Sequence, residues 1–164
     1  MNFESEGKNE KHYTLVFCRR TNKSGEREIL LGMKKRGFGV GKYNGFGGKI
    51  EEGETVEEAA IRELKEESGL DAGELLRRGY LVFDMKESCK LMKVHVFETF
   101  TFTGIPVESE EMRPEWFLEE NIPFEKMWPD DPYWMNLLLM SKQFLGRFDY
   151  SDDDTITEHS VKEV

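Results

Sequence analysis

A glycine-rich segment runs directly into an acidic helix, and this combination constrains the chain more than any other feature. The segment from Arg36 to Lys49 holds six glycines in fourteen residues. Glycine tolerates backbone conformations and close approaches that other residues do not. The segment is therefore expected to be a loop whose backbone lies close to another group.

The helix that follows carries its own start and stop signals. Thr55 is a candidate N-cap, and Glu58 three residues later completes a capping box. Apolar residues recur at helical spacing along one face. Gly69 is a natural residue just past the last turn. The sequence predicts a helix at Val56–Ser68.

Three carboxylates share one face of this helix. Glu63, Glu66 and Glu67 lie three or four positions apart, with Arg62 beside them. Like charges at this spacing repel one another, so a solvated acidic face is one interpretation. A hard divalent cation that offsets the repulsion is the other, since Mg²⁺ takes oxygen ligands and shares them with substrate phosphates.

The spacing of these residues favours the second interpretation. Five residues separate Gly48 from Glu54, seven more lead to Arg62, and the chain then reads Arg-Glu-Leu-Lys-Glu-Glu-Ser-Gly-Leu. This pattern over residues 48–70 resembles the signature of the Nudix hydrolase family. The resemblance implies an α/β/α sandwich with a central mixed β-sheet. It also implies hydrolysis of a nucleoside diphosphate linked to another moiety, with Mg²⁺ as the cofactor and Mn²⁺ as the alternative ion.

The resemblance assigns roles to the residues of the motif. Arg62 would orient the carboxylates and Glu54 would buttress the loop. Glu67 is the expected general base, with Glu63 as the alternative. The implied metal ligands are the backbone carbonyl of Gly47 and the carboxylates of Glu63, Glu66, Glu67 and Glu111.

The flanking segments resemble a narrower group within the family. Leu30–Lys49, Leu91–Phe97, Pro106–Phe117 and Ile122–Trp134 are similar to mammalian members that hydrolyse oxidised purine nucleoside triphosphates. Substrates of the 8-oxo-dGTP and 2-hydroxy-dATP type, cleaved to the monophosphate and pyrophosphate, are therefore expected. Such an enzyme would remove damaged nucleotides from the pool before they enter DNA.

Side-chain chemistry agrees with a purine site. Trp128 offers a flat face for stacking. Asp130 and Asp131 are adjacent carboxyl groups, and close, partly desolvated carboxyl groups can retain a proton at neutral pH. Such a pair could donate as well as accept hydrogen bonds. Asn44 carries a donor and an acceptor on one amide.

By resemblance, further residues would contact the base, the sugar or the phosphates. Each has a plain alternative, because phenylalanines are more often core residues and Trp-Pro-Asp-Asp is also a common turn sequence. The additional implied substrate-binding residues are Thr14, Lys34, Phe38, Phe46, Gly47, Gly48, Lys49, Phe83, Met92 and Pro129.

The chain departs from those relatives near the expected pocket. Tyr43 stands where the mammalian enzyme has Trp, and Met85 and residues 86–90 diverge. The ranking among oxidised and alkylated purine substrates is therefore left open. Two other functions also stay open: hydrolysis of dinucleoside polyphosphates or capped nucleotides, and nucleotide binding without turnover.

The remaining elements follow from strand patterns. We expect a single domain over residues 13–164, preceded by a flexible N-terminus at residues 1–12, and a loop at Pro123–Pro132. A second helix is expected at Tyr133–Leu145. The expected strands are Tyr13–Arg19 and Arg27–Met33 as a hairpin, then Gly79–Met85, Leu91–Thr103, Met112–Phe117 and a short one at Thr155–Thr157.

Charge and composition exclude several classes of protein. The formal charge of −10 arises from residues 51–67, which sum to −6, and residues 151–164, which sum to −4. An acidic protein is a poor candidate for stable binding to nucleic acid. No apolar run reaches the ~18–20 residues of a membrane helix, and no signal peptide is evident.

The two cysteines point to a reducing compartment. Cys18 and Cys89 are too few for a disulfide scaffold or a four-cysteine zinc site. We expect Cys18 to be buried and Cys89 to lie exposed in a turn. A cytoplasmic monomer, with nuclear or mitochondrial fractions, is the corresponding expectation.

Overall fold

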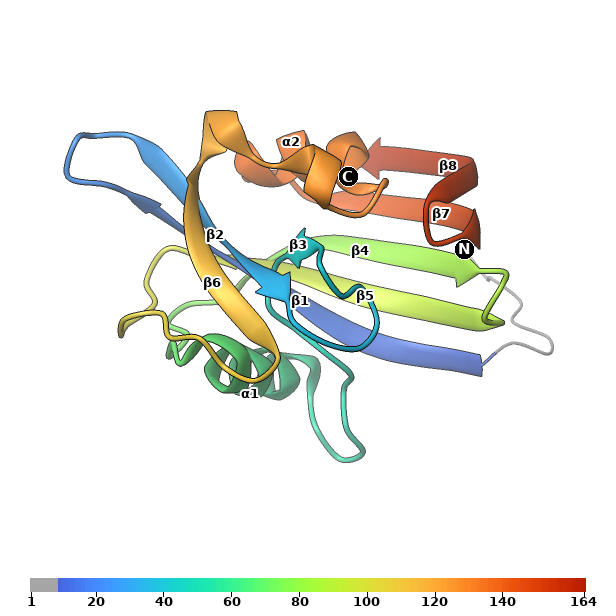
Figure 1. The fold of residues 1–164 in the computed structure, drawn as a ribbon, viewed down its shortest axis with the longest axis horizontal. Coiled ribbons are helices and arrows are strands. Elements are labelled where there is room, and N and C mark those ends of the chain that lie inside the picture. Colours follow the sequence, from blue (N-terminus) through green and yellow to red (C-terminus); the bar gives the residue numbers. More distant parts are fainter. Residues whose placement is uncertain (1–8) are drawn as a thin grey trace.

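The computed structural model describes residues 9–164 as a mixed eight-stranded sheet with a helix on each side (Figure 1). The helices are α1 (Val56–Ser68) and α2 (Asp131–Leu139), with 3₁₀ turns at Glu119–Asn121 and Phe124–Lys126. The strands are β1 (Asn9–Thr21), β2 (Arg27–Lys34), β3 (Tyr43–Asn44), β4 (Leu76–Met85), β5 (Lys90–Thr99), β6 (Met112–Leu118), β7 (Phe144–Asp152) and β8 (Thr155–Glu163).

The strand order is β3-β2-β1-β5-β4-β7-β8. Strand β6 lies outside this order and pairs with β2 as well. The pairs β1–β5 and β4–β7 are parallel, and the remaining pairs are antiparallel. The predicted mixed sheet is therefore confirmed. Pro114 is tolerated within β6 because that strand pairs with β2 alone among the described strands.

The long strand β1 links the two halves of the sheet. Its end pairs with β2, where Arg19 lies opposite Ile29, so the predicted hairpin is confirmed. Its first part pairs with β5, where Asn9 lies opposite Lys90. Asn9–His12 thus belong to a strand, although residues 1–12 were expected to be a flexible N-terminus; residues 1–8 lie outside the described part of the chain.

Alternation along the central strands produces two separate cores. Phe17 faces the core under α2, where it packs with Trp134. Its neighbours Val16 and Cys18 face the opposite core, which contains Leu64 of α1. Because successive side chains of a strand point to opposite faces, one strand supplies both cores. The predicted α/β/α sandwich follows from this arrangement.

Helix α1 has the predicted bounds and caps. The Thr55 hydroxyl accepts a hydrogen bond from the Glu58 N–H, and the Glu58 carboxylate accepts one from the Thr55 N–H. Gly69 ends the helix in the left-handed region with a φ of 78°. The local sequence signals were sufficient here because capping depends on neighbours along the chain.

The C-terminal third corrects three predictions. Helix α2 spans Asp131–Leu139, so it begins two residues before the predicted helix at Tyr133–Leu145 and ends six residues before it. Phe144 and Leu145 instead begin β7, a strand that no sequence pattern predicted. The predicted short strand at Thr155–Thr157 extends to Glu163 as β8. An apolar run suits either a helix or a buried strand, and sheet pairing decided the outcome.

Strand β5 ends at Thr99 and not at the predicted Thr103. The predicted environments of the two cysteines are confirmed, since Cys18 is buried and Cys89 is exposed. Within residues 9–164, no helix is both long enough and apolar enough to cross a membrane.

Candidate active site

The glycine-rich loop passes so close to its neighbours that side chains are excluded. A Cβ placed on Gly47 would lie 1.7 Å from the Thr14 carbonyl oxygen. A Cβ on Gly48 would lie 2.6 Å from Oε1 of Glu63. The Thr14 N–H donates to the Gly48 carbonyl at 2.9 Å, which fastens the loop to β1. The glycines therefore let the loop lie directly against both β1 and α1.

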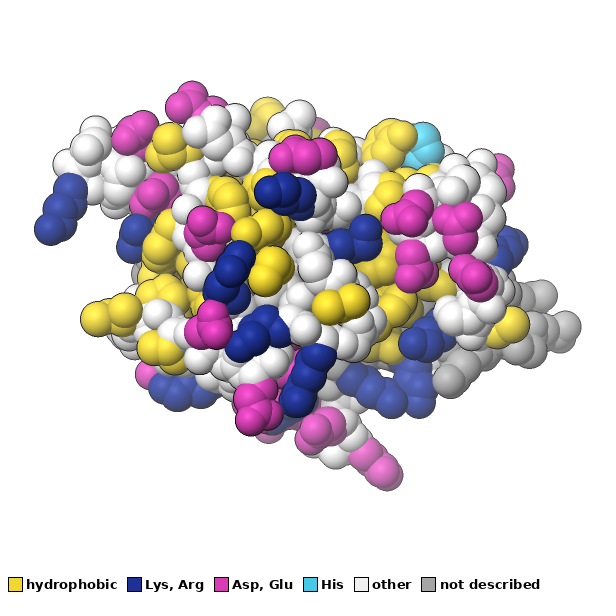
Figure 2. All heavy atoms as spheres, in the orientation of Figure 1, with side chains coloured by type: hydrophobic (Ala, Val, Ile, Leu, Met, Phe, Trp, Pro, Cys, Tyr) yellow, Lys and Arg dark blue, Asp and Glu magenta, His cyan; other side chains and the backbone are white. Residues whose placement is uncertain are grey.

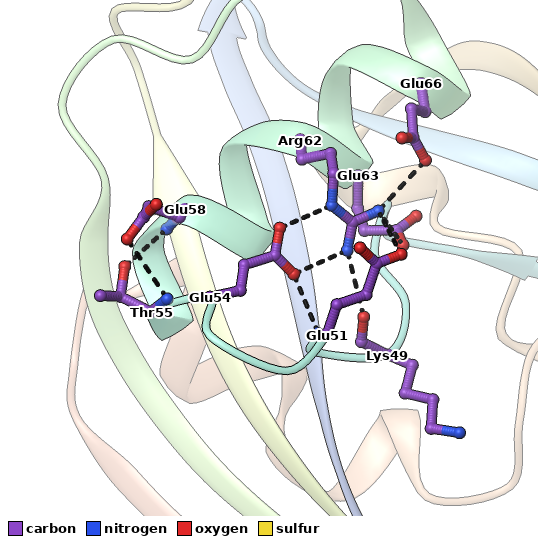
Figure 3. A network of polar contacts seen from close by, with 8 residues as sticks. All are labelled: Lys49, Glu51, Glu54, Thr55, Glu58, Arg62, Glu63 and Glu66. Atoms are coloured by element: carbon purple, nitrogen blue, oxygen red, sulfur yellow. Dashed lines mark hydrogen bonds and ion pairs between the residues drawn. The ribbon is translucent and has the colours of Figure 1, made fainter.

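Arg62, in the middle of α1, binds carboxylates of the preceding loop and of the helix itself (Figure 3). Its guanidinium binds both oxygens of Glu54, at 2.6 and 2.8 Å. It also donates to Glu63 at 2.9 Å and to Glu66 at 3.3 Å. A further bond of 3.2 Å reaches the Lys49 carbonyl. The hydrogen bond from Arg62 lowers the pKa of Glu54 to about 2, so Glu54 is ionised and braces the arginine.

Glu67 has a different environment from its helical neighbours. Only 5% of its surface is exposed, and one carboxylate oxygen accepts the Gly47 N–H at 2.8 Å. Burial raises the pKa of Glu67 to about 7, and the negative charges of Glu63 and Glu111 add to the effect. Glu67 is therefore a buried carboxyl group poised to exchange a proton near neutral pH.

Glu111 approaches the same region from the segment just before β6. Its two oxygens accept hydrogen bonds from Lys34 at 3.1 Å and Arg36 at 2.8 Å. Those bonds lower the pKa of Glu111. The negative charge of Glu111 contributes to the raised pKa of Glu67, although Glu111 lies outside the continuous motif.

The donor set fits a hard divalent cation. The carboxylates of Glu63 and Glu67 lie beside the Gly47–Gly48 backbone, and carboxylate oxygens are ligands of Mg²⁺. Across residues 9–164, no three Asp, Glu, His or Cys side chains are already arranged around a metal position. Arg62, Lys34 and Arg36 supply positive charge beside Glu63 and Glu111. The Gly47 carbonyl and the carboxylates of Glu63, Glu66, Glu67 and Glu111 stay the expected ligands of a cation.

A cavity of about 270 Å³ adjoins these carboxylates. Its volume is near the lower end of the ~300–1,000 Å³ typical of ligand pockets. Glu67 lines it, so the cavity opens onto the motif. The predicted substrate-binding residues that line the cavity are Thr14, Lys34, Phe38, Asn44, Gly47, Gly48, Phe83, Met92, Trp128, Asp130 and Asp131.

Three residues expected to bind substrate do not line this cavity. The Phe46 backbone pairs with Val16, and its side chain is fully buried in the core beneath α1. The ring therefore points away from the cavity. The Lys49 side chain lies beside a shallower hollow formed with His12 and Glu51. Pro129 lies between two lining residues without contributing to the wall itself.

Aromatic side chains form one wall of the cavity. The rings of Phe38 and Trp128 lie 4.9 Å apart. Lys42 stands 5.2 Å over the Trp128 ring, and Lys90 stands 5.0 Å over Phe38. The wall therefore offers a flat face for a base and positive charge at its edge.

Two buried carboxyl groups also line the cavity. Asp130 and Asp131 are 4% and 2% exposed. Asp130 accepts hydrogen bonds from Tyr150 at 2.5 Å and from the Trp134 indole at 2.8 Å. Burial raises the pKa of both carboxyl groups, and the nearby Asp130 charge raises that of Asp131 further. Oδ2 of Asp131 has no hydrogen-bond partner within residues 9–164.

Several lining residues were absent from the predicted site. Tyr150, Trp134 and Lys42 all contribute to the wall, and Met85 lies in it as the divergent segment suggested. Tyr150 belongs to β7, which no local pattern indicated. Its sequence neighbours, Asp149 and Ser151, gave no sign of a buried site, so pairing of β7 with β4 was needed to place it.

The chain belongs to the Nudix family. The Nudix domain profile matches residues 11–138, which include the glycine loop, α1 and the Asp130–Asp131 pair. A solved MutT protein from Bacillus halodurans has the same fold, with a TM-score of 0.80 over 93% of this chain and 97% of that one, at 22% identity.

Two curated relatives are far closer in sequence. The chain is 51% identical over 152 residues to the oxidized purine nucleoside triphosphate hydrolase of Mus musculus, covering 93% of this chain and 94% of that protein. It is 52% identical over 136 residues to the protein of the same name from Danio rerio, covering 83% and 87%.

Proposed function

We propose that the protein hydrolyses oxidised purine nucleoside triphosphates to the monophosphate and pyrophosphate. One observation carries the proposal: Glu67 and the Asp130–Asp131 pair line the same cavity. A base held at the aspartates would place its phosphates beside the carboxylates of α1. The identity to the mouse and zebrafish enzymes supports the same substrate class.

The base would be held by stacking and by hydrogen bonds. Trp128 and Phe38 provide the aromatic wall, and each stacked base is worth about 1–3 kcal/mol. Asp130 and Asp131 would bind the polar edge of the purine, with the Asn44 amide in the same cavity. Buried polar groups left unpaired by the wrong base would penalise that base.

At the phosphate end, the chain's own residues would position and deprotonate water. Bound Mg²⁺ would neutralise phosphate charge and make the phosphorus more electrophilic. Glu67, whose pKa is raised to about 7, would accept the proton of the attacking water. Arg62 would hold Glu63 in place through its 2.9 Å hydrogen bond. Lys34 would provide positive charge beside the phosphates.

The expected point of attack is the β-phosphorus. The water oxygen forms a bond to the β-phosphorus. The bond between the β-phosphorus and the oxygen that bridges it to the α-phosphorus breaks. The nucleoside monophosphate leaves with the bridging oxygen, and pyrophosphate carries the oxygen from water.

We also propose that the protein works as a cytoplasmic monomer, with nuclear or mitochondrial fractions, and without stable binding to nucleic acid.

The test is a comparison of kcat/KM with Mg²⁺ across 8-oxo-dGTP, 2-hydroxy-dATP, O6-methyl-dGTP, dGTP and a dinucleoside tetraphosphate. We expect the oxidised purines to exceed dGTP by at least tenfold. A dinucleoside tetraphosphate as the best substrate would favour the other hydrolytic function. No pyrophosphate from any substrate would favour a binding module. Hydrolysis in ¹⁸O-labelled water should label pyrophosphate, and label in the monophosphate would contradict β-attack.

A further inference from the structure

Tyr150 is buried beside the aspartates although it lies far from them in sequence. Strand β7 pairs in parallel with β4 and places Tyr150 opposite Met85 in the cavity wall. Only 1% of the tyrosine is exposed. Its ring lies edge-on to Trp128 at 6.1 Å and packs against Phe83 at 6.2 Å. Packing thus fixes the position of the hydroxyl group.

The hydroxyl of Tyr150 accepts one hydrogen bond and donates another, and its partners fix which is which. It accepts the Asp130 backbone N–H at 3.0 Å, and that group can only donate. The hydroxyl proton is therefore available for Oδ1 of Asp130, 2.5 Å away. Oδ2 of the same carboxyl accepts the Trp134 indole N–H at 2.8 Å, and an indole N–H also can only donate. Both oxygens of Asp130 thus receive donors.

Asp131 has the opposite environment. Its side chain is buried, and its Oδ2 lacks a hydrogen-bond partner within the described residues. The charged groups that act on it are Asp130, which opposes ionisation, and Lys42, which favours it. Lys42 is also drawn towards Asp154 at 3.5 Å and towards the Trp128 ring. A proton shared by the two carboxyl groups is therefore better placed on Asp131.

We propose that Tyr150 determines substrate preference as a positioning residue, because its hydroxyl fixes Asp130 as a hydrogen-bond acceptor and leaves Asp131 as the donor. The inference rests on the proposed function, since it concerns recognition of an oxidised purine by that pair. Tyr150 acts through Asp130 and requires no contact with the substrate.

A fixed order of donor and acceptor discriminates between oxidised purines. Guanine presents a carbonyl acceptor at position 6, whereas adenine presents an amino donor there. In one and the same pose, the two bases need opposite partners at that position. An aspartate pair locked by Tyr150 would therefore suit one of them, while a pair free to exchange its proton would suit both. Removal of the hydroxyl should weaken the discrimination.

The experiment compares the full-length wild type with Tyr150→Phe, which keeps the ring packing. We would measure kcat and KM for 8-oxo-dGTP and 2-hydroxy-dATP with Mg²⁺ between pH 6 and 9. We expect the wild type to prefer one substrate by at least tenfold. In the variant that preference should fall at least fivefold, through KM, with kcat changed less than twofold. The pH profile of KM should shift for the substrate that the wild type disfavours.

Tyr80→Phe is the matched control, because it makes the same chemical change beside His95, outside the cavity. It should leave the preference unchanged. An equal loss of activity on both substrates in Tyr150→Phe, or no preference in the wild type, would overturn the inference.

Equilibrium binding supplies a readout that needs no turnover. We would titrate 8-oxo-dGMP and 2-hydroxy-dAMP into both proteins without metal and compare the ratio of dissociation constants. The ratio should approach one in Tyr150→Phe, and an unchanged ratio would overturn the inference. Failure of wild-type hydrolysis with a changed binding ratio would count against the proposed function alone.

Discussion

Four of the six glutamates between residues 54 and 67 have different surroundings because their partners differ. Glu54 is clamped by Arg62, and Glu63 shares the same arginine. Glu66 is mostly exposed and makes one longer bond of 3.3 Å. Glu67 is buried and lacks a cationic hydrogen-bond donor among those described for it. Only Glu67 combines burial with a pKa of about 7, which favours it over Glu63 as the proposed base.

The first prediction concerns Glu67. Glu67→Gln keeps the shape of the side chain and its bond from Gly47 but removes the proton acceptor. General base catalysis contributes about 10²–10⁴-fold to a rate. We therefore expect kcat with 8-oxo-dGTP to fall by at least ~100-fold, while the product monophosphate still binds within about threefold. Glu74→Gln, at an exposed glutamate that does not line the cavity, is the control, and equal kcat losses in both variants would argue against a special role for Glu67.

A second prediction concerns the pH dependence of stability. Burial raises the pKa of the Asp130–Asp131 pair, so the folded protein keeps a proton that an unfolded carboxyl group, with a pKa of ~3.9, has lost. The free energy of unfolding therefore falls as the pH rises from about 4 through the folded pKa. Asp131→Asn removes this contribution.

The Tm of Asp131→Asn relative to wild type should accordingly be higher at pH 8 than at pH 4. A difference of ~1 kcal/mol corresponds to about 2–4 °C for a chain of this size. Thermal denaturation in the absence of nucleotide and metal would measure it. Asp71→Asn alters an exposed carboxylate and serves as the control. The prediction would be contradicted if the Tm values of the wild type and Asp131→Asn changed in parallel with pH.

At the scale of elements, α1 and the glycine loop form a unit that is specified locally. The capping box, the apolar stripe and Gly69 lie within a few residues of the contacts they make. Helix α2 is specified less clearly. Pro132 in its first turn suits a helix start, and Ser141, with a φ of 54°, lies in the turn that follows it. Its end depends on the strand that comes next.

The third prediction addresses the capping box. Thr55→Ala removes the acceptor for the Glu58 N–H, and loss of such a cap costs about 0.5–2 kcal/mol. We expect urea denaturation to show a loss of about 1 kcal/mol with an unchanged m-value. Thr55→Ser retains the hydroxyl and should lose less than half as much. A Thr55→Ala protein as stable as wild type would mean that the cap contributes nothing measurable.

At the scale of the whole molecule, the C-terminal hairpin completes both the core and the cavity. Phe144, Phe148 and Tyr150 of β7 are almost fully buried, and Tyr150 reaches the aspartates. Most of β8 is exposed. Acidic side chains gather at the turn between these strands, where Asp152, Asp153 and Asp154 lie (Figure 2). The segment that carries a charge of −4 is thus a paired hairpin, not an unstructured tail.

The fourth prediction compares how much β7 and β8 each contribute to stability. A chain ending at residue 143 loses three large core side chains, each worth about 1.5–3 kcal/mol on burial. That loss is comparable to the whole stability of a typical domain. We expect this chain to lack a cooperative unfolding transition by circular dichroism. A chain ending at residue 154 should still unfold cooperatively, at a lower Tm. Equal behaviour of the two truncated chains would contradict the distinction.

The sequence alone determined the glycine loop, α1 with both of its caps, and the family, because these depend on residues close together in the chain. Through the family resemblance it also identified about half of the residues that line the cavity. Strand β7, the end of α2 and the side to which Phe46 points were not determined, since each depends on which distant strand pairs alongside.

Only the tertiary structure decided how the two aspartates differ. Adjacent in sequence, Asp130 and Asp131 have the same chemistry and the same local signals. Tyr150 and Trp134 donate to one of them and leave Oδ2 of the other unpaired within residues 9–164. Protonation depends on burial and on hydrogen-bond donors, and packing of β7 against β4 supplies one of those donors from twenty residues away.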